Sequence, residues 1–166
     1  METYFDPTTR FKYNNVLIAG GTVFKFRGCG VNKIIMFITY GCCYYTSTKF
    51  NNDAILIKMY RSIGKMFILK SIRKSLLERN MTPKSVDEFI DLISENFDAF
   101  SYKDEILLLF NDEDLEVYRR KADNETYDLL KIFINSSDLS MALRNCFFDE
   151  RSVAPMLRDK VKEYLK

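Results

Sequence analysis

Histidine and tryptophan are both absent from this chain of 166 residues. Histidine is the commonest general base, the commonest metal ligand and the usual activator of a serine or cysteine nucleophile. Its absence excludes most hydrolase designs and leaves only enzymes based on carboxylates or lysine. No catalytic motif supports such an enzyme, so we expect a protein that is not an enzyme and uses no cofactor.

Long apolar runs are also missing. The longest, IIMFITYGCCYY, is far shorter than the roughly 20 residues that cross a bilayer. The first fifteen residues show neither a basic start followed by an apolar segment nor a small-residue cleavage site, so no signal peptide is expected. These features predict a protein without a transmembrane segment, located in the cytoplasm or nucleus.

The chain has only four cysteines, Cys29, Cys42, Cys43 and Cys146. Adjacent residues of a strand point to opposite faces, so Cys42 and Cys43 are unsuited to a mutual disulfide or a shared metal site. Without histidine or a Cys-x-x-Cys pair, no zinc site is expected, and the thiols should be reduced. Within the run 33–46, Gly41 predicts a turn or bulge after Tyr40, leaving one cysteine buried and the other nearer the surface.

Acidic residues are scarce in the first half of the chain, and the two halves have net charges of opposite sign. Residues 1–83 contain 13 lysines and arginines against 4 carboxylates, whereas residues 84–166 contain 12 against 19. The small net charge of +2 conceals this asymmetry. It predicts either an anionic partner for the first half or docking of that half against the acidic region 87–128.

A basic patch on the first half is the candidate binding site. Clustered cations can neutralise the phosphates of a lipid head group or a nucleic acid. The alternative is a solvated sheet face that docks on the acidic region. The candidate anionic-ligand residues include Lys25, Arg27 and Lys33, which flank the expected loop GCGVN, and also Lys49, Lys65, Arg73 and Lys74.

Short runs of β-branched and aromatic residues between glycines predict strands in the first half. We place them near 13–19, 21–27, 33–40, 42–48, 54–61 and 65–71. A short helix should follow over SIRKSLLERN, and a longer amphipathic helix should begin at Ser85, where Ser85 and Glu88 match a capping box. Further helices are expected near 102–110, 113–121, 125–135, 138–147 and 153–165, with a strand as the alternative for EILLLF at 105–110.

The pattern predicts an α+β protein in which an N-terminal antiparallel β-sheet or bent barrel is followed by a helical C-terminal half. Two parts are expected. Residues 1–98 would form a β-rich domain closed by an amphipathic helix, and residues 99–166 a helical extension that packs on it.

The segment 14–98 resembles the pleckstrin-homology superfold. VFKFRGCGVNKIIMFITYGCCYYT resembles its opening strands and basic loop, AILIKMYR and KMFILKS resemble later strands, and SVDEFIDLISENF resembles its closing helix. The resemblance implies binding of phosphoinositides or peptides, with Lys25, Arg27 and Lys33 at the matching positions. It departs from the family in the extra SIRKSLLERN helix and in having six expected strands rather than seven.

From these features we expect an intracellular adaptor or assembly subunit that binds a protein partner, with an anionic ligand, a phosphoinositide or nucleic acid, on its basic N-terminal half. The alternative is a nucleic-acid or ribonucleoprotein-associated factor, and the third hypothesis is a histidine-free enzyme.

Overall fold

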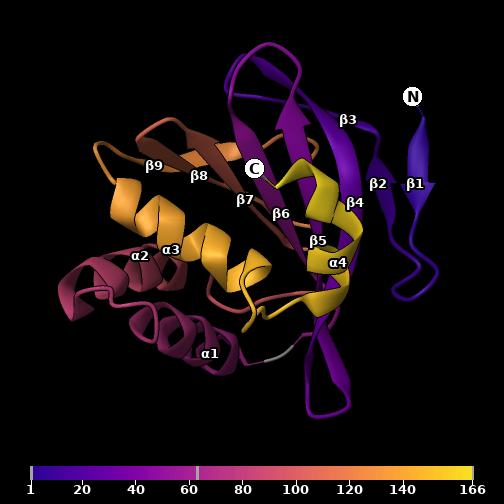
Figure 1. Ribbon diagram of the computed structural model, residues 1–166. Coiled ribbons are helices and arrows are strands. Elements are labelled where there is room, and N and C mark those ends of the chain that lie inside the picture. Colours follow the sequence, from indigo (N-terminus) through magenta and orange to yellow (C-terminus); the bar gives the residue numbers. More distant parts are fainter. Residues whose placement is uncertain (1, 63, 166) are drawn as a thin grey trace.

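A curled sheet of seven antiparallel strands forms the centre of the computed structural model, which describes residues 2–62 and 64–165 (Figure 1). The strands follow one another across the sheet in chain order, so each pairs with its neighbours in sequence. The α+β class and the antiparallel sheet predicted from the sequence are confirmed. The strands are β3 (Val16–Ala19), β4 (Thr22–Ile34), β5 (Phe37–Ser47), β6 (Asp53–Met59), β7 (Glu105–Asn111), β8 (Asp114–Arg120) and β9 (Asp128–Phe133).

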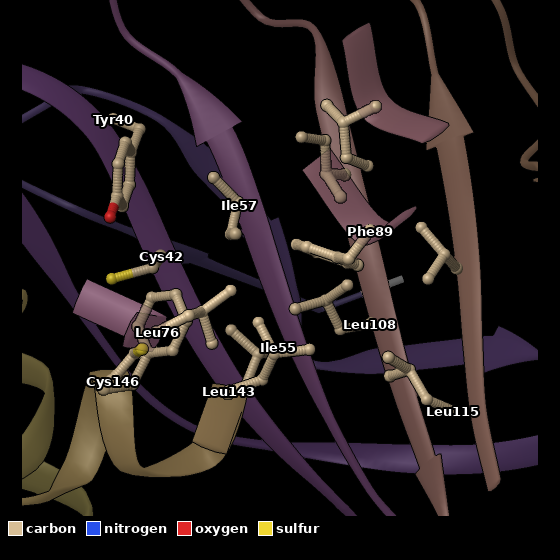
Figure 2. Close-up of a cluster of buried hydrophobic side chains, with 14 of the residues drawn as sticks. Tyr40, Cys42, Ile55, Ile57, Leu76, Phe89, Leu108, Leu115, Leu143 and Cys146 are labelled. Atoms are coloured by element: carbon tan, nitrogen blue, oxygen red, sulfur yellow. The ribbon is translucent and has the colours of Figure 1, made fainter. Parts of the chain in front are cut away.

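The helices cover one face of this sheet and form the larger core with it. Figure 2 shows side chains of the strands, such as Tyr40 and Leu108, pointing toward Leu76 and Phe89 from the helices. The helices α1 and α2 come between β6 and β7, which are nevertheless hydrogen-bonded neighbours. The helices are α1 (Lys65–Leu77), α2 (Pro83–Asn96), α3 (Ser137–Phe148), α4 (Pro155–Val161) and the short 3-10 helix η1 (Lys162–Tyr164).

A separate hairpin covers part of the opposite face. It consists of β1 (Thr3–Phe5) and β2 (Lys12–Asn14), and it packs Phe11 and Tyr13 into a second core with residues of β5, β6 and β7. Both faces of the central strands are therefore buried. This explains why a strand such as EILLLFN carries apolar residues at consecutive positions rather than alternating ones.

The GCGVN segment, expected as a loop, lies inside the thirteen-residue strand β4. Its glycines allow α4 to pack directly on the strand. A Cβ atom on Gly30 would overlap the backbone nitrogen of Leu157 and lie 2.9 Å from its Cα, and a Cβ on Gly28 would lie 2.9 Å from Val161 Cγ1. The glycines therefore mark a close approach of two backbones, and the loop predicted at GCGVN was wrong.

The turn or bulge expected after Tyr40 is also absent, because Tyr40 and Gly41 pair in register with Asn32 and Val31, and the chain reverses at residues 35 and 36. The nearby irregularity in the pairing falls before Tyr40, between this register and the pair of Lys33 with Ile38. A Cβ on Gly41 would overlap the hydroxyl of Tyr13 from the covering hairpin. Cys42 and Cys43 do face opposite sides of the strand, as predicted. Both are fully buried, however, so the prediction of one cysteine near the surface was wrong.

Residues 65–71, expected as a strand, form the first half of α1. Met, Leu and Lys are good helix formers, and Ile68, Leu69 and Leu76 bury one helical face. The amphipathic helix predicted from Ser85 is confirmed, with Val86, Phe89, Ile90 and Ile93 buried. It begins earlier than expected, because Pro83 occupies its first turn and Thr82 provides the cap.

Three segments expected as helices, 102–110, 113–121 and 125–135, instead contain the strands β7, β8 and β9. The strand alternative for EILLLF at 105–110 is the correct one. The expected parts 1–98 and 99–166 share a single sheet through the pairing of β6 with β7. Helices near 138–147 and 153–165 are confirmed as α3 and as α4 with η1.

Candidate protein-binding groove

The structure distributes the seven predicted anionic-ligand residues over several surfaces. Lys25 and Lys33 are eight residues apart on β4, a separation of about 26 Å along a strand. Arg27 lies between them and is partly buried. Its Nε donates to Thr46 Oγ1 at 2.7 Å, and its guanidinium lies 4.7 Å from the centre of the Tyr164 ring.

Three of the remaining four cations have partners within the fold. The Nζ atom of Lys65 donates to two backbone carbonyl groups, those of Ser94 and Phe97, each at 2.8 Å, near the end of α2. Arg73 pairs with Asp87 at 2.7 Å, and Lys74 lies 4.0 Å from Glu78. Lys49 is exposed on the β5–β6 loop.

Some ion pairs do join the basic half to the acidic region. Besides Arg73 with Asp87, Lys58 lies 3.1 Å from Glu105. Lys25, Lys33 and Lys49 are exposed and have no ion-pair partner in the part of the chain that the structure describes. Internal docking thus uses part of the basic charge and leaves part of it to solvent.

The buried titratable groups have structural roles. Burial raises the pKa of the thiols of Cys42, Cys43 and Cys146, which are therefore protonated at neutral pH. The buried carboxylate of Glu105 binds Lys58 and Arg120 and accepts a hydrogen bond from Tyr127. Within residues 2–62 and 64–165, no group of three acidic, cysteine or histidine side chains is arranged to hold a metal ion.

A groove of about 730 Å³ lies beside the last strand of the sheet. One wall is β9 with the turn that follows it, another is α3, and the third is the connection from α1 to α2. Among the residues that the structure describes, β9 pairs with β8 alone, and its other edge takes no part in the sheet's hydrogen bonding. The groove is therefore bounded by backbone groups that a further strand could use.

Apolar side chains are exposed at and beside this edge. They include Ile132 on β9 and Ile134 in the following turn, which are 43% and 71% exposed, and Met141 on α3. Leu129 is exposed on the same strand. Native edge strands commonly carry charges that prevent pairing with other chains. Among the groove residues of β9, only Lys131 carries a charge, and its ammonium is paired with Glu88 of α2.

An arginine with a buried side chain joins two of the elements that form the groove. Arg79 follows α1, and its guanidinium forms a two-pronged hydrogen bond with Asp149 at 2.8 and 3.0 Å. It also donates to the backbone carbonyl of Ser75 at 2.6 Å. This arginine links α1 to the end of α3, so the groove walls are pre-organised.

Sequence reasoning missed this groove because residues 125–135 were expected as a helix. The signal that could have found it is the pair of runs LEVYRR and YDLLKIFI, separated by the polar stretch KADNET. Strand-forming residues on both sides of a turn segment are typical of a hairpin.

Comparisons with known proteins give no family for this chain. No model of a known protein family matches it, and no curated protein matches it either. No helix in the described part of the chain is long and apolar enough to cross a membrane.

Proposed function

We propose that this chain is a non-enzymatic adaptor or assembly subunit whose groove receives an extended segment of a protein partner. The segment would add a strand to the sheet along β9. The open edge of β9, with exposed apolar side chains in a groove, is the observation that carries this proposal. Main-chain hydrogen bonds would supply affinity, and the apolar side chains would select the partner's sequence.

The opposite edge of the sheet provides a comparison. Its strand, β3, has only four residues, and short edge strands are poor templates for pairing. It exposes one large apolar residue, Ile18, at 66% of its surface. A strand-adding partner is therefore expected at β9 and not at β3.

A pair of charge substitutions tests the proposal. Lysine at Ile132 would place a charge on the open edge strand that borders the groove, whereas lysine at Ile18 adds the same charge to the other edge strand. The tagged wild-type chain and both variants are used to capture partners from the native cell, with quantification by mass spectrometry. We expect Ile132→Lys to lower recovery of the specific partner at least tenfold and Ile18→Lys to leave it within twofold.

Circular dichroism and gel filtration serve as folding controls, since both positions are on the surface. Equal recovery by the two variants would contradict the proposal. A wild-type dimer that Ile132→Lys dissociates would also contradict it, because the occupant of the groove would then be a second copy of this chain.

A further inference from the structure

The turn between β4 and β5 exposes large apolar side chains. Ile35 and Met36 form the turn and are 89% and 84% exposed, and the neighbouring Phe37 is also exposed. Figure 1 shows this hairpin extending beyond the other elements at the end of the sheet near α1. Hairpin turns are ordinarily polar, so an Ile-Met turn needs a reason other than folding.

The backbone at the turn strengthens this point. Ile35 has a φ angle of +60°, a conformation that favours glycine and asparagine and that is strained for a β-branched residue. A more stable hairpin would have asparagine or glycine at this position. The isoleucine side chain therefore costs stability where it also lacks a core to fill.

Further apolar residues lie beside the turn. A hollow of about 260 Å³ is lined by Phe67 of α1 together with Ile34, Ile35 and Phe37 of the hairpin. Met66, next to Phe67, is exposed as well. We call the set Ile35, Met36, Phe37, Met66 and Phe67 the hairpin end.

Cations surround the hairpin end, and acidic residues are missing from the segments that form it. Lys33 is exposed two residues before Ile35, and the guanidinium of Arg61 lies 5.5 Å from the centre of the Phe37 ring. Lys70, also exposed, follows Met66 by one helical turn. Neither residues 31–40 nor residues 60–77 contain an aspartate or glutamate.

We propose that the hairpin end binds the surface of an anionic lipid bilayer. Ile35 and Met36 would enter the boundary between head groups and acyl chains, and Lys33 and Arg61 would contact the head groups. The order of these residues matches the layers of a membrane surface. Two strand residues, about 7 Å, separate Lys33 from Ile35, and apolar groups of interfacial proteins enter about 5–10 Å.

Charge and apolar surface act together in this proposal. Anionic lipids attract cations near the surface, and the insertion of apolar side chains adds to that attraction. Binding should therefore require anionic lipid and weaken at high salt. This membrane site is distinct from the groove at β9, which none of its residues line.

A fluorescent label at the turn tests the inference directly. Because all four native cysteines are buried, Met36→Cys provides one accessible thiol for an environment-sensitive nitrobenzoxadiazole probe. The labelled protein is mixed with vesicles of phosphatidylcholine alone or with 30% phosphatidylserine. We expect a blue shift and quenching by spin-labelled lipid only with phosphatidylserine, and loss of both at high salt.

Unlabelled variants separate the roles of apolar surface and charge in vesicle co-sedimentation. Ile35→Asn removes the apolar side chain and suits the positive φ angle, so it should raise the melting temperature while lowering binding at least tenfold. Ile134→Asn, an equal change at the β9 groove, should leave binding within twofold. The double variant Lys33→Gln/Arg61→Gln should bind at least fivefold more weakly and depend less on salt.

Two results would overturn the inference. The first is no binding of the folded wild-type chain to phosphatidylserine vesicles at low salt. The second is binding in which the probe at residue 36 is unchanged and Ile35→Asn binds normally, since a basic surface elsewhere would then be responsible.

Discussion

At the scale of single residues, the burial of the thiols should make the free energy of unfolding depend on pH. Burial raises the pKa of Cys42, Cys43 and Cys146 in the folded state, whereas the unfolded chain ionises its thiols near pH 8.5. A raised pKa gives stability that is complete below the unfolded pKa and is lost as pH rises toward the folded one. The free energy of unfolding should therefore be steady near pH 7–8 and fall above about pH 9.

Each such thiol contributes a slope of at most about 1.4 kcal/mol per pH unit. Urea denaturation at pH 7, 8, 9 and 10 measures the slope, with Cys42→Ala as control. This variant should be less stable at pH 7 but should lose stability more slowly above pH 9. Equal unfolding free energies at pH 7 and pH 10 would contradict the burial of these thiols.

The residues Gly41, Cys42 and Cys43 show what a local sequence pattern can predict and what depends on distant contacts. The opposite orientation of Cys42 and Cys43 follows from strand geometry and was predicted. The burial of both was not, because it depends on the hairpin that brings Phe11 and Tyr13 over β5. Likewise, the local sequence around Gly41 is typical of a turn. The need for glycine at this position is explained by its close contact with Tyr13.

At the scale of elements, the contact of α4 with β4 depends on glycine. Gly30→Ala would force α4 away from the strand, because the added Cβ overlaps backbone atoms of Leu157 that cannot rotate aside. We expect a loss of about 1–3 kcal/mol in the free energy of unfolding. Gly64→Ala is the matched control, since its Cβ meets nothing within 4 Å, and it should change stability by less than about 0.5 kcal/mol.

Chemical denaturation of both variants checks this prediction. If Gly30→Ala were as stable as Gly64→Ala, α4 would not pack on β4 as described.

The type of a helix or strand could be predicted from the sequence where one of its faces is exposed to solvent. The helix α2 has buried residues at regular helical spacing and was found. The strand β7 is buried along nearly its whole length, so its sequence has no period that separates a strand from a buried helix. The strand β9 was missed for another reason, since its exposed apolar residues resemble a helical face when its pairing with β8 is unknown.

At the scale of the whole molecule, the pattern of strand and helix segments predicted an α+β protein with an antiparallel sheet, but not the extent of the sheet. The pairing of Lys58 on β6 with Glu105 on β7 spans two intervening helices, and no local signal announces so distant a partner. Nor could the spatial arrangement of the expected basic site be predicted, because closeness in sequence did not mean closeness in the fold. Its residues are close in sequence, yet β4 is one long strand that separates Lys25 from Lys33.

The finished sheet has two ends with different surfaces. One end presents the open edge of β9 beside a groove, and the β4–β5 turn presents an apolar tip surrounded by cations. The two proposals together assign a protein partner to one surface and an anionic membrane to the other. Strand addition at β9 is the central claim in this description.

Hydrogen–deuterium exchange of the chain alone and bound to its captured partner tests that claim most directly. If the partner adds a strand, amides of residues 128–134 gain protection on binding, while those of β3, the other edge, exchange as before. Unchanged exchange at 128–134, with new protection confined to other elements, would contradict it.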